Sequence, residues 1–152
     1  MNAPDYVEPL IGYRHWRILD GELCSPFLTH RWARGVNTAS CQCEYHHADP
    51  PPGHMCACGL HAWYRPCPRL GYATPGLVAG AIAMWGEVEL HETGLRSQYA
   101  TVVALVQPMS HTIKRRRLME IADELEVEVV TARRLPAAAM NHGLAAPECA
   151  IP

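Results

Sequence analysis

The chain has 152 residues, of which 49% are hydrophobic and 18% are charged, and its formal net charge is -2. This length predicts one compact domain, since typical domains hold about 100–150 residues. The sequence pI of about 6.5 excludes a generally basic nucleic-acid-binding protein, for which a domain pI above about 9 is expected.

The first half of the chain predicts short strands followed by a long loop region. Residues 9–19 alternate large apolar and basic side chains, which favours a short strand with a bulge, and Asp20-Gly21 indicates a turn. Residues 31–40 are expected to be irregular, with Trp32 reaching back to the core. From 41 to 69 the prolines, which include Pro50-Pro51-Pro52, exclude a long helix or a central strand.

The second half is more regular. Residues 77–90 predict two strands, or one strand bent at Gly80 or Gly86, and residues 99–106 predict another. A helix is expected over about 111–125, capped by Ser110 or Thr112, and a strand over 127–130. This order of strand, helix and strand favours a crossover that joins parallel strands.

Together these elements predict an α+β fold: a small, mostly-β body with one C-terminal helix and a metal-stapled loop region. Residues 1–135 form the single predicted metal-binding domain, and residues 136–152 form an Ala/Pro-rich tail that we expect to be poorly ordered.

The loop region carries two Cys-x-Cys pairs, Cys41-Gln42-Cys43 and Cys56-Ala57-Cys58, with histidines beside them. No run approaches the roughly 20 apolar residues of a membrane span, and residues 1–6 lack the features of a secretory signal. We therefore expect a cytoplasmic protein without a membrane partner. In that compartment clustered thiols are metal ligands more often than disulfide partners. The sequence accordingly predicts a metal site.

Two ligand sets satisfy the spacing. The four cysteines could make a tetrahedral set, but Cys-x-Cys is tighter than the usual Cys-x-x-Cys. A mixed set would use Cys41, one of His46 or His47, Cys56 and Cys58. Zinc accepts either set. An iron–sulfur cluster is the alternative cofactor, because it uses the same thiolates and accepts a histidine ligand.

Two further motifs carry a resemblance. These are Cys56-Ala57-Cys58-Gly59-Leu60-His61-Ala62 and the stretch from Gly80 to Arg96, which contains Trp85-Gly86 and His91-Glu92. With them, the chain resembles uncharacterised small Cys/His metal-binding proteins of actinobacteria and their phages over roughly residues 10–130. The resemblance implies the ligand set Cys41, His46, Cys56 and Cys58, with Cys43 as an addition to the shared pattern. It implies no activity.

Other polar groups offer weaker signals. Lys114, Arg115, Arg116 and Arg117 could contact the phosphates of a nucleic acid, but Glu120, Asp123 and Glu124 lie within reach for pairing along the helix. His91, Glu92 and Arg96 could do acid–base or anion-binding work, but we favour the simpler interpretation of a charged loop after a half-buried strand.

The sequence lacks the H-E-x-x-H zinc-protease motif, the H-x-E and P-C-x-x-C pairing of nucleoside deaminases, a phosphate-binding glycine loop and a G-x-S-x-G elbow. Glu44 is the one carboxylate near the predicted ligands that could serve a zinc hydrolase. We therefore expect a non-enzymatic zinc-binding interaction module that contacts a protein or a nucleic acid. The alternatives are an iron–sulfur redox or sensing protein and a zinc-dependent hydrolase.

Overall fold

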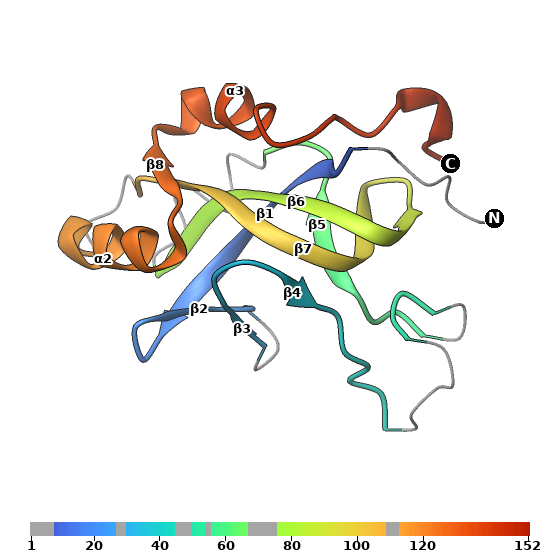
Figure 1. The fold of residues 1–152 in the computed structure, drawn as a ribbon, viewed down its shortest axis with the longest axis horizontal. Helices are drawn as coiled ribbons and strands as arrows, with labels where there is room; N and C mark the ends of the chain where they lie inside the picture. Colours follow the sequence, from blue (N-terminus) through green and yellow to red (C-terminus); the bar gives the residue numbers. More distant parts are fainter. Residues whose placement is uncertain (1–7, 27–29, 45–49, 54–55, 67–75, 109–112) are drawn as a thin grey trace.

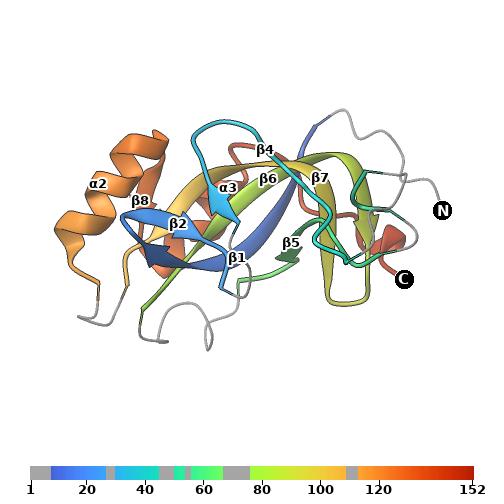
Figure 2. The same cartoon turned by 90° about the horizontal axis from the view of Figure 1, so that it is seen from below.

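The computed structural model describes residues 8–26, 30–44, 50–53, 56–66, 76–108 and 113–152, and β-strands dominate them (Figures 1 and 2). Within these described residues the α-helices are α2 (Arg115–Leu125) and α3 (Leu135–Ala139), both in the C-terminal part. The predicted class, a mostly-β body with a C-terminal helical region, is confirmed. The described strands are β1 (Leu10–Leu19), β2 (Glu22–Cys24), β3 (Arg31–Trp32), β4 (Asn37–Thr38), β5 (Leu60–Trp63), β6 (Leu77–Leu90), β7 (Gly94–Val106) and β8 (Glu128–Val130).

The sheet closes on itself into a small barrel-like ring. Tyr13 of β1 has two partners, Ala81 of β6 and Trp63 of β5, so these strands lie on opposite edges of β1. In the same way Ser97 of β7 lies between Val88 of β6 and Leu60 of β5. The ring therefore runs β1–β6–β7–β5 and back to β1, and every pairing in it is antiparallel.

Turn chemistry sets the local geometry. Asp20 and Gly21 have φ angles of 50° and 83° and form the two-residue loop between β1 and β2, as a type I′ hairpin turn requires. β1 itself is a ten-residue strand, longer than the short bulged strand expected. β6 is one bent strand, with a register shift between Trp85 and Val88 around Gly86, whose φ is 79°.

Apolar side chains pack on both faces of the sheet. The inner cluster includes Trp16, Trp32 and residues of α2, so Trp32 belongs to the core as predicted. The outer cluster brings the small side chains of β6 against α3. Gly80 is required where β6 meets β7, because a Cβ there would lie 2.3 Å from the Ala104 carbonyl oxygen and 2.9 Å from the Trp16 ring.

The C-terminal part contains the expected crossover. β8 pairs with β7 in parallel after α2, which confirms the predicted strand–helix–strand unit. The helix begins after Lys114, and the predicted caps Ser110 and Thr112 lie outside the described residues.

Residues 136–152 differ from the poorly ordered tail that we expected. Ala138 and Ala139 of α3 are buried, because alanines let this short helix lie close to the alanines of β6. The Ile11 amide donates to the Leu144 carbonyl at 2.7 Å, and the Leu144 amide donates to the Pro9 carbonyl at 2.8 Å. Hydrogen bonds thus tie this segment to the start of β1.

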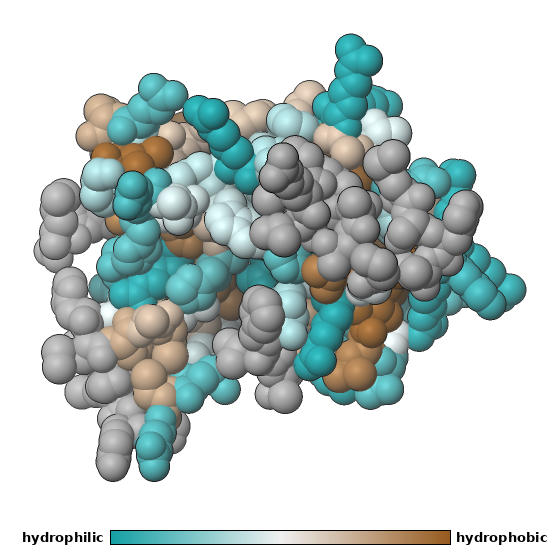
Figure 3. Space-filling view, turned by 180° about the vertical axis from the view of Figure 1, so that it is seen from behind, coloured by the Kyte–Doolittle hydropathy of each residue, from teal (hydrophilic) through white to brown (hydrophobic). Residues whose placement is uncertain are grey.

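The described surface shows no single large apolar area on the face drawn in Figure 3, where hydrophobic residues form separate groups among hydrophilic ones. Among the helices of the described ranges, none has the length and apolar character needed to cross a membrane.

Candidate metal centre

Strand β7 brings the two cysteine segments together. β4 and β5 pair with the same edge of β7, and the Ala39 amide donates to the Gln98 carbonyl while Leu60 lies opposite Ser97. The chain leaving β4 and the chain entering β5 therefore meet within one residue of each other along β7. Cys41 follows Ala39 closely in the chain and Cys58 closely precedes Leu60, so the fold places the two Cys-x-Cys pairs side by side.

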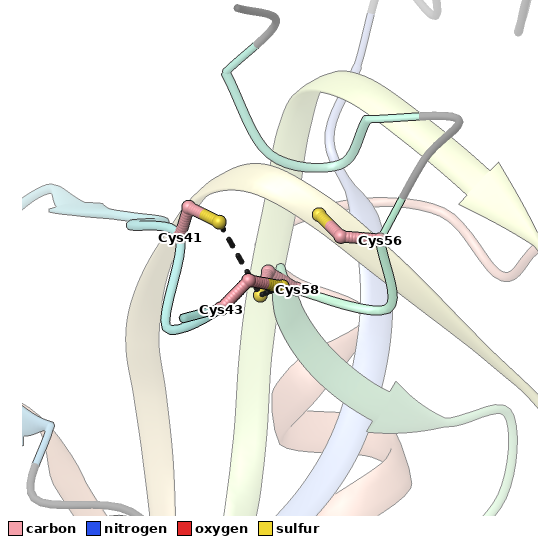
Figure 4. Close-up of side chains that lie close together, drawn as sticks. All are labelled: Cys41, Cys43, Cys56 and Cys58. Atoms are coloured by element: carbon pink, nitrogen blue, oxygen red, sulfur yellow. Dashed lines mark hydrogen bonds between the residues drawn. The ribbon is translucent and has the colours of Figure 1, made fainter. Parts of the chain in front are cut away.

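All four thiol groups converge in this place (Figure 4). The Sγ atoms of Cys41, Cys43, Cys56 and Cys58 lie within 4.8 Å of one another, and all four residues are partly buried. Cys43 Sγ lies 3.5 Å from Cys58 Sγ, which in turn lies 3.9 Å from Cys41 Sγ. These separations are much longer than the roughly 2.05 Å of a disulfide bond.

The spacing suits one tetrahedral metal ion. Four thiolates that each bind zinc at about 2.3 Å have sulfur atoms about 3.8 Å apart, which falls between the two measured separations. The backbone amide of Gln42 also donates to Cys58 Sγ at 3.3 Å, an outer hydrogen bond of the kind that orients and stabilises a metal-bound thiolate.

The electrostatics of the cluster favour a cation. The pKa of Cys43 is raised to about 12, first by its hydrogen bond with Cys58 and then by that with Cys41. Thiolates packed this closely repel one another, and a bound cation would offset that repulsion.

Arg96 of β7 fastens the cysteine loop to the sheet. Its side chain is 6% exposed, and its Nη1 donates to the carbonyl oxygens of Cys56 at 2.5 Å and Cys58 at 2.8 Å. Its Nη2 donates to the Gly53 carbonyl at 3.2 Å and to a carboxylate oxygen of Glu89 at 2.5 Å. One buried guanidinium thus holds three backbone carbonyls of the loop, which includes the end of the proline-rich bridge.

Gly59 permits this close approach. Its φ of 149° lies in the region that favours glycine, and a Cβ at this position would lie 3.1 Å from the Arg96 Cβ. The residue after Cys58 therefore needs to be glycine both for its backbone conformation and for space.

The structure groups Cys41, Cys56 and Cys58 of the predicted ligand set and adds Cys43, which the resemblance had left outside it. The fourth predicted ligand, His46, lies outside the described residues together with its alternative His47, so its part in the site stays a prediction. The sequence offered no signal for the role of Arg96, because three of its four acceptors are backbone carbonyls. Glu44 is exposed and lies beside Cys43 in the chain.

The structure places the side chains of the predicted group His91, Glu92 and Arg96 in different contacts. Arg96 is committed to the loop carbonyls, so the grouping of His91, Glu92 and Arg96 does not present a free guanidinium for an anion. Glu89 instead joins Arg96 to His91, whose Nε2 lies 3.3 Å from the second carboxylate oxygen of Glu89.

The basic run at the start of α2 is exposed and partly paired. Arg116 and Arg117 each form an ion pair of 3.2 Å with Glu120. This confirms the predicted pairing along the helix for Glu120.

Comparison of the chain with protein-family profiles, with curated proteins and with solved structures gives no match. The geometry of the four thiols therefore carries the functional argument by itself.

Proposed function

We propose that the chain is a non-enzymatic zinc-binding interaction module, in which Cys41, Cys43, Cys56 and Cys58 hold one zinc ion. The single observation that carries this proposal is the convergence of the four Sγ atoms within 4.8 Å of one another. Bound there, zinc would supply a covalent cross-link between the segment after β4 and the segment before β5. Structural zinc contributes directly to folding free energy in this way.

A single ion fits the thiols better than an iron–sulfur cluster does. In a cluster the four thiolates are divided over two or more iron atoms, so iron and sulfide atoms separate the thiolates that bind different irons. All four Sγ atoms instead lie within 4.8 Å of one another, which matches thiolates that share one ion. This favours zinc over the cluster as the cofactor.

Four thiolates also favour a structural role over hydrolysis. A catalytic zinc site keeps a position for water, with three protein ligands around the metal. Four cysteine ligands fill the tetrahedron and leave no such position. A filled zinc site of this kind supports a module that acts by contacting a partner through its surface.

For a partner we propose a protein, with a nucleic acid as the second candidate. The overall charge of -2 gives no general attraction to phosphates. The exposed side chains of Lys114, Arg115, Arg116 and Arg117 are the local exception, and Glu120 already neutralises part of their charge. Nucleic-acid binding through this run would weaken steeply as salt increases.

The test is elemental analysis and an absorption spectrum of the full chain purified without oxygen. We expect a colourless protein with about one zinc per chain, in line with a closed four-ligand site. A brown protein with several iron and sulfide atoms per chain would overturn the zinc assignment. A chain that binds no metal at all would overturn the whole proposal.

The ligand set is tested with cobalt(II), because the visible absorption of the cobalt form depends on how many thiolates bind it. We expect Cys43→Ser to change this spectrum and His46→Ala to leave it unchanged. The reverse pattern would show three cysteines with His46 as the ligand set.

A further inference from the structure

His61 of β5 is a second side chain of the sheet that holds the cysteine loop. Its Nε2 lies 2.8 Å from the Ala57 carbonyl oxygen. A carbonyl oxygen only accepts hydrogen bonds, so the ring carries a proton on Nε2 and donates it. Ala57 lies between Cys56 and Cys58, so His61 holds the middle residue of the segment Cys56-Ala57-Cys58, here named the cysteine turn.

All three backbone carbonyls of the cysteine turn accept hydrogen bonds from the sheet. Arg96 Nη1 donates to the first and the third, those of Cys56 and Cys58, and His61 donates to the second. Each carbonyl belongs to a planar peptide group, so these bonds limit the directions in which the two cysteine side chains leave the backbone. Two side chains of the sheet thus restrain a turn that carries two of the four thiols.

The strand register explains why His61 and Arg96 reach the same turn. The two residues lie directly opposite each other in the antiparallel pair of β5 and β7, and opposite residues project from the same face of a sheet with Cβ atoms about 4.5–5.5 Å apart. The cysteine turn leads into β5 through Gly59, which keeps it close to both side chains. The His61 backbone is itself held, because its carbonyl accepts from Arg14 Nη1 at 3.1 Å.

The His61 ring is neutral at slightly alkaline pH. Although the residue is exposed, neighbouring groups exclude water from the ring, which lowers its pKa below the ordinary 6.5. The hydrogen bond to Ala57 acts in the opposite direction, and the charges of Arg96, Arg14 and His91 lower the pKa further. The Ala57 carbonyl therefore binds a neutral N–H donor, and the side-chain amide of glutamine offers a donor of the same kind.

We propose that His61 is a positioning residue of the zinc site, which holds the middle of the cysteine turn while Arg96 holds its two ends. The inference rests on the proposed function, since it concerns the ion that the four thiols would bind. A turn whose carbonyls are already held loses less conformational freedom when its thiolates bind a metal. His61 thereby increases zinc affinity without being one of the four ligands.

The experiment measures the zinc affinity of the full chain at a pH of about 7.5, above the ordinary pKa of histidine, by competition with a chelator. His61→Leu removes the donor and should weaken zinc binding about two- to tenfold, the range that one neutral hydrogen bond sets. His61→Gln keeps a donor and should bind zinc as tightly as the unaltered chain. His142→Leu, the same change at an exposed histidine after α3, is the matched control and should leave zinc affinity unchanged.

Cobalt(II) distinguishes a positioning residue from a ligand. We expect the visible spectrum of the cobalt form to be the same for His61→Leu and the unaltered chain, because the same four thiolates bind the ion in both. A changed spectrum would show that His61 is itself a ligand and would overturn the positioning role.

The affinities separate this inference from the proposed function. A full chain that takes up no zinc would overturn both. Zinc that binds His61→Leu and His142→Leu equally tightly would overturn the positioning role alone. The same holds if His61→Gln binds zinc as weakly as His61→Leu, because the donated hydrogen bond would then not be the cause of the loss.

Discussion

Replacing Arg96 with glutamine is the sharpest test of how the fold supports the metal centre. The substitution removes four hydrogen bonds from one buried group, to the carbonyls of Gly53, Cys56 and Cys58 and to the carboxylate of Glu89. Hydrogen bonds to a charged group contribute about 1.5–3 kcal/mol each, but their effects are not additive. Removing one partner of a buried charged pair typically lowers the free energy of unfolding by about 3–5 kcal/mol. Because the side chain of Glu89 is 38% exposed and water can solvate it, we expect a loss at the lower end of this range, about 3 kcal/mol.

Two measurements check this value. Denaturant unfolding of the zinc-loaded chain should show the loss in the free energy of unfolding. Chelator competition should show a zinc affinity lowered by about 10–100-fold, which is typical when an outer-shell partner of a metal site is lost.

Arg34→Gln is the matched control. Arg34 pairs with Glu126 at 3.0 Å, but both side chains are 62% exposed, so this change should cost about 0–1 kcal/mol and leave zinc affinity intact. If Arg96→Gln behaved like Arg34→Gln in both assays, the argument that Arg96 holds the cysteine loop would be wrong.

Three further predictions concern single positions. Gly59→Ala should lower both zinc affinity and stability, because the new Cβ would press on Arg96. Gly35→Ala is the control, because Gly35 also has a positive φ, of 76°, but nothing lies within 4 Å of the added Cβ. It should lower stability only by the backbone strain of about 1–2 kcal/mol. Equal zinc affinity in the two variants would refute the argument that the Gly59→Ala side chain presses on Arg96. His15 has a pKa lowered by burial and then by Arg14, so its unfolded form binds more protons and stability should fall as pH drops below about 6.5. His15→Gln should therefore show a smaller loss of stability than the unaltered chain between pH 7.5 and 5.5 in denaturant titrations, and an unchanged loss would contradict this. Gly80→Ala should lower the free energy of unfolding by more than about 3 kcal/mol, because its Cβ would collide with the Ala104 carbonyl oxygen and a packed sheet cannot easily relieve this strain. A variant of normal stability in the same titrations would show that β6 and β7 can separate there.

Several parts of the fold followed from local sequence signals. Asp20-Gly21 adopts the positive φ angles that a tight hairpin requires, and the glycine in Trp85-Gly86 marks the bend of β6. The 3.6-residue period of the C-terminal helix and the β-prone runs on either side of it predicted the parallel crossover. These features depend on neighbours in the chain, so the sequence alone could reveal them.

Local sequence signals predicted only part of the candidate site. The two Cys-x-Cys pairs predicted a metal site, but the spacing left Cys43 and a histidine as competing ligands. Pairing of β4 and β5 along one edge of β7 brings Cys43 into the group. That pairing joins residues far apart in the sequence, so no local pattern contains it.

The sequence by itself predicted a metal site, because thiols at this density in a proline-rich loop favour a metal over a packed core. Only the tertiary structure decided what holds the thiols in place. Arg96 lies 38 to 43 residues from the carbonyls that it binds, so only the folded sheet brings these groups together. Backbone carbonyls and buried charges acquire these roles through long-range packing, which residue identity along the chain does not encode in any local pattern.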